Sequence, residues 1–415
     1  MSIELLHSFI NRYLTKKEIM YRIPSSENID DFWSKLIDYR KSFKIDLPLL
    51  DQDNNNFWFI INDSIKDNIR NIDNMATQDL FASIPENIEN AIIADALIDE
   101  AFNSSVIEGA FSTKKRTKEM IEKKIKPADK SEQMIVNNHQ ALEFILENKH
   151  YPLDENIILC IYNILTNGTL DEDDIVEKYR SGAVYVWDSA SQTTIYTAPP
   201  YTEVQSLMNS LIEFINTNND IHPIVKACII HFYFVYIHPF FDGNGRTARA
   251  ISYMYLLQNG YDFFKFFSIS SVVREEKKKY YKSIKDVEDY SSDLTYFISY
   301  YTEMILHSIK NILDRFKKEF GYRIIKTKLE RKGIILSKRQ SKALEYYIKG
   351  QKNFTTIDEY EKKYKVAYET ARTDLNQFEF LGIFEKSKIG KKFIYKILDF
   401  KKINDNLQNL NNFSK

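Results

Sequence analysis

Cysteine, glycine and proline are scarce in this chain of 415 residues, which has two cysteines, eleven glycines and nine prolines. Cys160 and Cys228 each lie in an apolar stretch, which favours buried structural thiols over a disulfide or a metal pair. Residues that interrupt helices, glycine and proline, are therefore few, and apolar side chains recur at three- and four-residue spacings, as in IILCIYNIL. This periodicity predicts a mainly helical protein.

Long apolar runs are also missing, since none reaches the eighteen or so residues that a membrane-spanning helix needs. The first residues, MSIELLHSFINRYL, contain neither the basic region nor the cleavage site of a secretory signal. We therefore expect a cytoplasmic protein with no membrane partner. The length and the ordinary composition, with 44% hydrophobic and 28% charged residues, predict two or three globular domains.

The formal net charge of -1 conceals an uneven distribution. Residues 321–415 contain 22 Lys and Arg against 11 Asp and Glu, so that segment carries +11 and the preceding 320 residues about -12. Such an asymmetry suggests a separate module with a polyanionic partner. A lysine-rich, solvated surface is the alternative explanation.

The chain divides into four regions by pattern. Residues 1–85 are expected to form amphipathic helices broken by a loop at LPLLDQDNNN, and they could dock a target, pack on the core or mediate a homodimer. Residues 86–320 are expected to form a helical core that ends in one long helix from about residue 293. A C-terminal domain follows over 321–400, and the tail, 401–415, is expected to fray.

One segment of the core does not fit a helix. In GAVYVWDSASQTTIYTAPP, residues 182–200, β-branched and aromatic residues flank a polar turn, which predicts a β-hairpin. A single hairpin among helices cannot form a sheet core. Its backbone edge is therefore a candidate for binding another chain.

Residues 321–400 favour a winged helix-turn-helix. Three helices with short joints are expected around SKRQSKALEYYIKG, FTTIDEYEKKY and AYETARTDLNQFEFLG, followed by two short strands around Gly390. The third would be a recognition helix for DNA, from residue 367 to 380. Its acidic residues Glu369, Asp374 and Glu379 would repel phosphates if they faced the groove, and winged helices also dock proteins.

The stretch HPFFDGNGRTAR, residues 238–249, contains two of the eleven glycines, one on each side of a single asparagine. An apolar helix should end near His238, because Pro239 disfavours helical geometry in the residue before it. A tight loop then leads into a new helix. Glycines at 243 and 245 let backbone amides approach a ligand at a helix N-terminus, where the helix dipole favours anions. The loop is therefore a candidate phosphate site.

The charged residues of this stretch suggest a reaction. Arg246 and Arg249 share a helix face and can both reach a polyphosphate. Asp242 offers a hard oxygen ligand for Mg²⁺, and His238 can take a proton from an attacking hydroxyl. Together they indicate transfer of a phosphorus-containing group from a nucleotide to an alcohol. Seven residues at set spacing, at frequencies of roughly 5% each, would occur together by chance at on the order of 10⁻⁹ per position; they are His238, Phe240, Asp242, Gly243, Asn244, Gly245 and Arg246.

This stretch resembles the signature of the Fic (Fido) family, H-x-F-x-D-G-N-G-R-x-x-R, at every fixed position, and the resemblance extends over roughly residues 90–310. It implies an all-helical core that binds ATP and transfers AMP to a Ser, Thr or Tyr hydroxyl of a target protein or of the enzyme itself, releasing pyrophosphate. The implied roles are these: general base His238, packing anchor Phe240, Mg²⁺ ligand Asp242, phosphate cradle Gly243, Asn244 and Gly245, β-phosphate contact Arg246 and γ-phosphate contact Arg249.

The resemblance gives roles to two further segments. The predicted hairpin looks like the family's flap, which lies over the active site and pairs with the target segment. Tyr280 and Tyr281 match a recurrent tyrosine pair near the family's adenine pocket. Paired tyrosines on a helix are also common in protein cores, and that alternative remains open.

Upstream, SSVIEG resembles the inhibitory helix of many Fic proteins, expected here at about residues 88–110. Ser104 and Glu108 stand four apart and should share a helical face, followed by Gly109. The resemblance implies that Glu108 pairs with Arg249, takes the group that would hold the γ-phosphate and so misaligns ATP. A solvated helix face is the alternative.

These observations favour an auto-inhibited protein adenylyltransferase that uses ATP and Mg²⁺ and carries a DNA-binding appendage. A second hypothesis is a DNA-binding regulator whose pocket only senses a nucleotide, which would not need His238. The sequence is also compatible with transfer of a different group, such as UMP or phosphate, and with removal of AMP, in which Glu108 would orient a water molecule.

Overall fold

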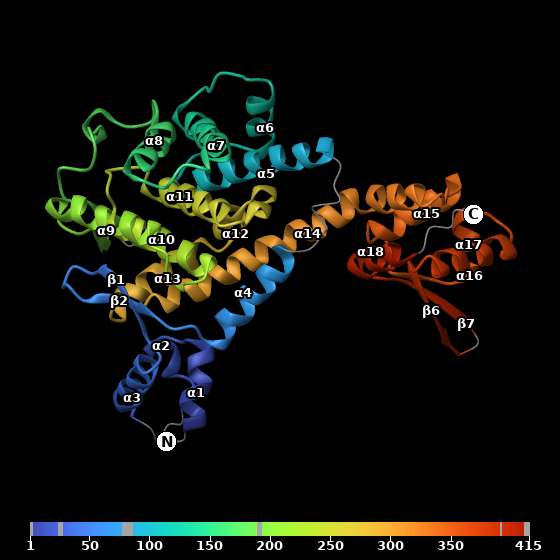
Figure 1. Cartoon of the computed structure of the whole chain (residues 1–415), viewed down its shortest axis with the longest axis horizontal. Coiled ribbons are helices and arrows are strands. Elements are labelled where there is room, and N and C mark those ends of the chain that lie inside the picture. Colours follow the sequence, from blue (N-terminus) through green and yellow to red (C-terminus); the bar gives the residue numbers. More distant parts are fainter. Residues whose placement is uncertain (1–2, 24–27, 77–85, 189–192, 391, 411–415) are drawn as a thin grey trace. The chain divides into compact units, whose positions relative to one another are not determined.

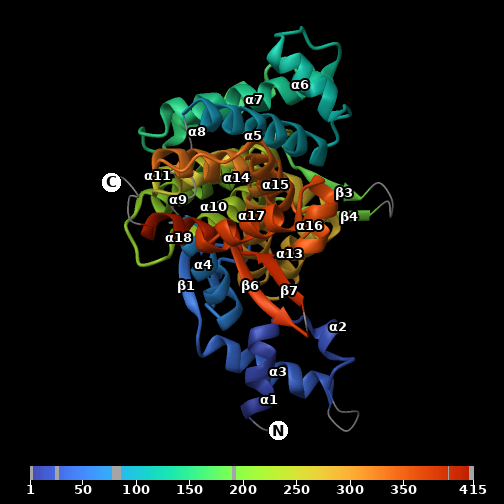
Figure 2. The ribbon, with the colours of Figure 1, turned by 90° about the vertical axis from the view of Figure 1, so that its right-hand side faces the viewer.

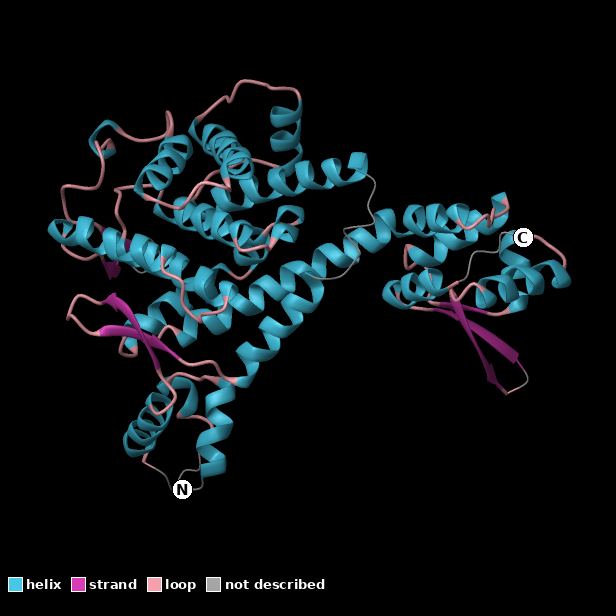
Figure 3. Ribbon diagram, viewed as in Figure 1, coloured by secondary structure: helices cyan, strands magenta, loops and turns pink. Residues whose placement is uncertain are grey.

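The structure of this chain, a computed structural model, describes residues 3–23, 28–76, 86–188, 193–390 and 392–410. It is mainly helical, as predicted, with three small sheets in those ranges (Figures 1 and 3). The chain folds into two compact units, of which the first extends to Ile309 and the second begins at Lys310. The boundary between the units lies inside helix α14 (Thr295–Arg331). We expected it about ten residues later, at residue 320. Within the described ranges, no helix combines the length and apolarity needed to cross a membrane.

The N-terminal elements differ in one place from the expected pattern. Their bounds are α1 Ile3–Arg12, α2 Lys16–Ile19, α3 Ile29–Lys41, β1 Ile45–Leu50, β2 Asn56–Phe59 and α4 Asp63–Ala76. We expected LPLLDQDNNN to be a loop, but its first half belongs to strand β1, which pairs with β2. Leu47 and Leu49 are buried while their neighbours are exposed, and this alternation is typical of a strand with one face on the core. Pro48 is tolerated because β1 is an edge strand of a two-stranded sheet.

Residues 1–85 had three possible roles, and packing on the core is observed for the described part. The Tyr13 hydroxyl donates to the Asp293 carboxylate (2.6 Å), and Arg40 donates to the Tyr296 hydroxyl (2.8 Å). The amide of Leu294 donates to the Trp58 carbonyl (2.8 Å). These buried contacts make the N-terminal elements part of the first unit.

The core surrounds one helix that is apolar on every side. The elements have these bounds: α5 Glu86–Ile107, α6 Lys114–Glu122, α7 Lys130–Asn148, α8 Glu155–Thr166, α9 Val204–Asn216, α10 Pro223–Ile237, α11 Asn244–Gln258, α12 Ile269–Glu275, α13 Lys277–Asp289, and the 3₁₀ turns Glu172–Asp174, Tyr201–Glu203 and Asp262–Phe266. All residues of α10 from Ile224 to Phe234 are buried, as an all-round apolar helix requires. Helices α5, α7 and α8 lie above α10 and α11 (Figures 1 and 2).

The hairpin expected at residues 182–200 is present. Strand β3 (Tyr185–Asp188) pairs antiparallel with β4 (Thr193–Thr197), and Val186 faces Tyr196 in the register. The centre of the predicted turn, residues 189–192, lies outside the described residues. Both cysteines are free, but only Cys228 is fully buried, since Cys160 is half-buried on α8.

The second unit contains more structure than expected. After α14 its elements are α15 Lys338–Ile348, β5 Phe354–Thr355, α16 Ile357–Tyr364, α17 Tyr368–Phe380, β6 Phe384–Ile389, β7 Lys392–Ile397 and α18 Phe400–Asn409. The sheet order is β5-β7-β6. The expectation of a frayed tail is wrong for residues 401–409, because Ile403 and Leu407 are buried and hold α18 in place. Residues 411–415 lie outside the described residues.

Candidate active site

His238 ends helix α10 in a left-handed backbone conformation, with φ 50° and ψ 60°. Its Nδ1 atom lies 3.2 Å from the carbonyl oxygen of Val235. A carbonyl can only accept a hydrogen bond, so Nδ1 carries the proton and Nε2 keeps its lone pair. Burial lowers the pKa of His238 to about 4, which leaves the ring neutral near pH 7. The side chain is therefore ready to accept a proton at Nε2.

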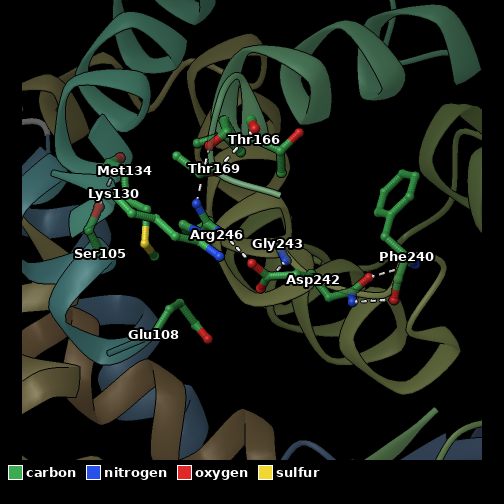
Figure 4. Close-up of polar contacts among 12 residues, drawn as sticks. Ser105, Glu108, Lys130, Met134, Thr166, Thr169, Phe240, Asp242, Gly243 and Arg246 are labelled. Carbon is green, nitrogen blue, oxygen red and sulfur yellow. Dashed lines mark hydrogen bonds and ion pairs between the residues drawn. The ribbon is translucent and has the colours of Figure 1, made fainter. Parts of the chain in front are cut away.

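The loop after His238 carries Phe240, Asp242 and Gly243 (Figure 4) and is held by its own asparagine, Asn244. The Asn244 side chain accepts a hydrogen bond from the amide of Phe240 (3.0 Å) and donates one to the Phe240 carbonyl (2.8 Å). Phe240 is fully buried and stacks on Tyr162, with 3.5 Å between the ring centroids. Asn244 thus fixes the loop from inside, while Phe240 anchors it to α8.

Asp242 and Arg246 form the polar side of the loop. Arg246 donates to the carboxylate of Asp242 (3.1 Å) and to the carbonyl of Leu165 (3.1 Å). The other carboxylate oxygen of Asp242 accepts from the Gly243 amide (2.6 Å). The Arg246 side chain is buried, whereas that of Asp242 is 44% exposed, so the carboxylate can meet a ligand from solution.

Helix α11 begins without a side-chain cap, because its N-cap residue is Gly243. Its first backbone amides therefore have no capping acceptor from that residue. A Cβ at position 243 would lie 2.8 Å from the Thr166 side chain, and φ is +88°, so only glycine fits. Close approach of the loop to α8 creates an amide-rich helix end of the kind that binds anions.

Replacing Gly243 by alanine is expected to lower the free energy of unfolding more than Gly260→Ala does. Both positions have positive φ, 88° and 85°, but a Cβ at 260 meets nothing within 4 Å. Strain at a left-handed position costs about 1–3 kcal/mol, and the clash with Thr166 adds to it only at 243. Chemical denaturation of both variants measures the difference. Equal losses of unfolding free energy in the two variants would show that the loop can move away from Thr166 without an energetic cost.

Arg249 lies one turn further along α11, where it meets Glu108 and Ser104. It donates to one oxygen of Glu108 (2.7 Å), to the Ser104 hydroxyl (2.8 Å) and to the Ser104 carbonyl (3.0 Å). Burial alone would raise the pKa of Glu108, but the charge and hydrogen bond of Arg249, together with the charges of Arg246 and Lys277, outweigh burial and lower it. Glu108 is therefore ionised and its charge is directed at Arg249. It lies just past the end of α5, rather than inside the helix as expected.

The carboxylate of Glu108 also lies against the start of α11. A Cβ added to Gly245 would be 2.1 Å from Oε1 of Glu108, so the absence of a side chain at 245 makes room for this oxygen. Gly109 follows with φ +96° and turns the chain away. Glu108 therefore occupies the space in front of the first turn of α11.

Tyr280 and Tyr281 lie at the same pocket but are not equivalent. The pocket is lined by both tyrosines and by Glu108, His238 and Gly245, with other residues from α10, α13 and β4. Tyr280 is buried and its hydroxyl pairs with the buried His231 (2.9 Å), whereas Tyr281 is 37% exposed. Tyr280 is thus both a core residue and part of the pocket wall.

Arg180 is a site residue that the motif analysis missed. Its buried guanidinium donates to the backbone carbonyls of His238 (2.7 Å) and Gly182 (2.8 Å) and also bonds that of Pro199. It thereby ties the base of the hairpin to the turn that carries His238. A charged residue directly before a predicted hairpin, in KYRSG, was the available signal.

Within the described part of the chain, no three His, Cys, Asp or Glu side chains converge as a metal site. Asp242 contributes a single carboxylate. A one-carboxylate position is enough for Mg²⁺ when phosphate oxygens and water supply the other ligands.

Comparison with known proteins gives a family match over the motif. A model described as the Fic/DOC family matches residues 152–256. A protein adenylyltransferase Fic of Nematostella vectensis is 28% identical over 41% of this chain and 39% of its own length. A probable protein adenylyltransferase of Aquifex aeolicus is 26% identical over 34% of this chain and 39% of its own length. The chain thus spans about two fifths of these relatives.

The fold has a match among solved structures. A Fic family protein of Desulfovibrio desulfuricans superposes with a TM-score of 0.54 at 19% identity, covering 81% of this chain and 97% of that one. At this identity the likeness concerns the fold alone.

Proposed function

Because this chain belongs to the Fic family, we propose that it is a protein adenylyltransferase, transferring AMP from ATP to a Ser, Thr or Tyr hydroxyl of a target protein or of itself. The relatives that carry this name support the proposal. One observation carries it. A neutral His238 with Nε2 available lines the same pocket as Gly245, in the uncapped first turn of α11.

The proposed reaction forms one bond and breaks one. The target hydroxyl oxygen attacks the α-phosphorus of ATP, the bond from that phosphorus to the bridging oxygen of the β-phosphate breaks, and pyrophosphate leaves. The hydroxyl proton passes to Nε2 of His238, while Nδ1–H stays bonded to Val235 and keeps the ring in place. Phosphates beside the ring would raise its pKa from about 4 and make it a stronger base.

The phosphates would be bound by the amides of the loop from Gly243 to Gly245 and by Arg246 and Arg249. Asp242 would hold Mg²⁺, which neutralises phosphate charge when it is bound. For this the carboxylate must release the Gly243 amide or Arg246, and its 44% exposure leaves room to turn. Tyr281 and the buried Tyr280 would line the nucleoside end, and the edge of the hairpin would pair with the target.

Glu108 acts as a brake in this proposal. It occupies Arg249, the group that would hold the γ-phosphate, and lies in front of the first turn of α11. Its negative charge would repel the phosphate that displaced it. ATP that binds beside Glu108 would hold its α-phosphate out of line with the attacking hydroxyl. Ser104 positions the arginine that Glu108 occupies.

Labelled nucleotides test the activity. In Glu108→Gly with Mg²⁺, label from the α-phosphate of ATP is expected on protein, and label from the γ-phosphate is expected only in pyrophosphate. Label from the γ-position on protein would indicate phosphate transfer, and transfer from UTP in preference to ATP would indicate UMP transfer. Release of AMP from modified protein by the wild type would assign Glu108 to the reverse reaction.

A further inference from the structure

The second unit contains two helices joined by a short turn. Helix α16 ends at Lys365, which has a left-handed backbone (φ 50°), and α17 starts at Tyr368. Helix α15 precedes this pair and the antiparallel hairpin β6–β7 follows it, with β5 pairing on the other edge of β7. This is the element order in which the second helix of the pair reads DNA and a hairpin contacts the backbone beside it.

Of the acidic residues of α17, Asp374 is paired in the interior of the module and Glu379 is paired near its surface. Asp374, only 3% exposed, accepts both guanidinium donors of Arg339 (2.6 and 3.1 Å), the Tyr360 hydroxyl (3.0 Å) and the Gln340 amide (3.0 Å). Glu379 lies 3.7 Å from Lys386. The repulsion of phosphates expected from the sequence is thereby reduced, because Asp374 faces inward and is neutralised.

The exposed side chains of α17 include groups that can bind a polyanion. Tyr368, Arg372 and Thr373 are exposed, and Glu369 beside them pairs with Arg372 at 3.4 Å. An exposed pair of this kind is worth little, so DNA can draw Arg372 away from Glu369 at small cost. The N-cap of α17, Ala367, supplies no side-chain acceptor to the first amides.

The hairpin is fixed to α17 at its base and projects beyond it (Figure 1). Asn376 of α17 accepts from Lys386 of β6 (3.0 Å) and from the Tyr395 hydroxyl of β7 (2.7 Å). Further out, Lys388 and Lys392 are exposed. A rigid base with cations beyond it can follow a phosphate backbone.

We propose that α17 and the hairpin β6–β7 form a surface that binds duplex DNA. Helix α17 enters the major groove with Arg372 and Thr373 toward the bases, and Lys388 contacts phosphates. The charge of +11 over residues 321–415 draws the module to DNA whatever the sequence of the duplex. This goes beyond AMP transfer and does not depend on it.

Fluorescence anisotropy of the full chain with a labelled duplex, over a series of salt concentrations, tests the surface. The logarithm of the association constant should fall linearly with the logarithm of salt concentration, by about 0.9 per phosphate contact. Arg372→Ala/Lys388→Ala should weaken binding about tenfold and reduce that slope by about 1, because Lys388 is the phosphate contact of the two. Lys401→Ala/Lys402→Ala, with the same charge change on exposed residues of α18, is the matched control and should change neither.

Three results would overturn the proposal: a salt-independent signal, equal weakening by the two double variants, or stronger binding of single-stranded RNA than of the duplex. Equal thermal unfolding of the variants, followed by circular dichroism, shows that the module remains folded. The Arg372→Ala/Lys388→Ala variant should retain AMP transfer in a Glu108→Gly background. Failure of the DNA proposal is therefore distinguishable from failure of the enzymatic one.

Discussion

Replacing Glu108 by glycine is expected to raise the rate of AMP transfer by about 100-fold or more. The substitution removes the carboxylate that accepts from Arg249 at 2.7 Å and lies against Gly245. Arg249 is then free to hold the γ-phosphate, and the α-phosphate can align with the attacking hydroxyl. Misplacement of reacting groups by about 1 Å can cost on the order of 10²-fold in rate, which sets the expected gain.

A matched control comes from helix α5, which directly precedes Glu108. Glu89 of α5 pairs with Lys265 at 2.9 Å and is not part of the pocket lining, so Glu89→Gly should leave the rate unchanged. Glu108→Gln keeps the size of the side chain and removes its charge, so an intermediate gain is expected. An unchanged rate in Glu108→Gly, with ATP bound, would mean that this ion pair supports the fold and does not restrain the enzyme.

Replacing His238 by alanine in the Glu108→Gly protein is expected to reduce transfer by about 10²–10⁴-fold. The ring holds its proton on Nδ1 through Val235 and is the histidine that lines the pocket. Nucleotide binding should survive, since the amides of α11 and both arginines remain. His139→Ala removes a half-buried histidine of α7 that pairs with Glu143 and should have no effect on transfer.

This loss separates the two classes of function. A protein that only senses a nucleotide needs the amides and arginines of the loop, and its response would survive His238→Ala. An enzyme that transfers AMP needs the base as well. Retained transfer in the double variant would assign the proton to another group and contradict the role given to His238.

The pH dependence follows from the same residue. Burial lowers the pKa of His238 to about 4, so its neutral, basic form is present above that pH and is lost as the pH falls through it. For Glu108→Gly, kcat/KM should therefore hold from about pH 8 down to about pH 5 and fall below. Removing Glu108 also removes a negative charge that raises this pKa, which moves the fall lower still.

The backbone geometry of the loop after His238 could be predicted from the sequence, because local rules determine it. Pro239 ends α10 beside His238, and Gly243 is needed where φ is positive and Thr166 lies close. The contact between Glu108 and Arg249, separated by 141 residues, came from resemblance alone, since no local rule joins α5 to α11. The helices of the core and the hairpin β3–β4 were predicted from periodicity and β-branched residues.

The parts that were missed depend on contacts distant in sequence. Strand β1 contains a proline and lies in a polar setting, and only pairing with β2 makes it a strand. Helix α18 has few apolar residues, and burial of Ile403 and Leu407 against the module stabilises it. The role of Arg180 could not be predicted from a motif, because it donates to backbone carbonyls, which carry no sequence signal and which the fold brings together.

The most direct test is a count of covalently attached AMP by intact-protein mass spectrometry after incubation with ATP and Mg²⁺. Wild type, Glu108→Gly and Glu108→Gly/His238→Ala would be compared at equal concentration, with the enzyme as its own target. The account predicts little AMP on the wild type, AMP on the single variant and almost none on the double variant. Equal modification of all three proteins would contradict both the base and the brake.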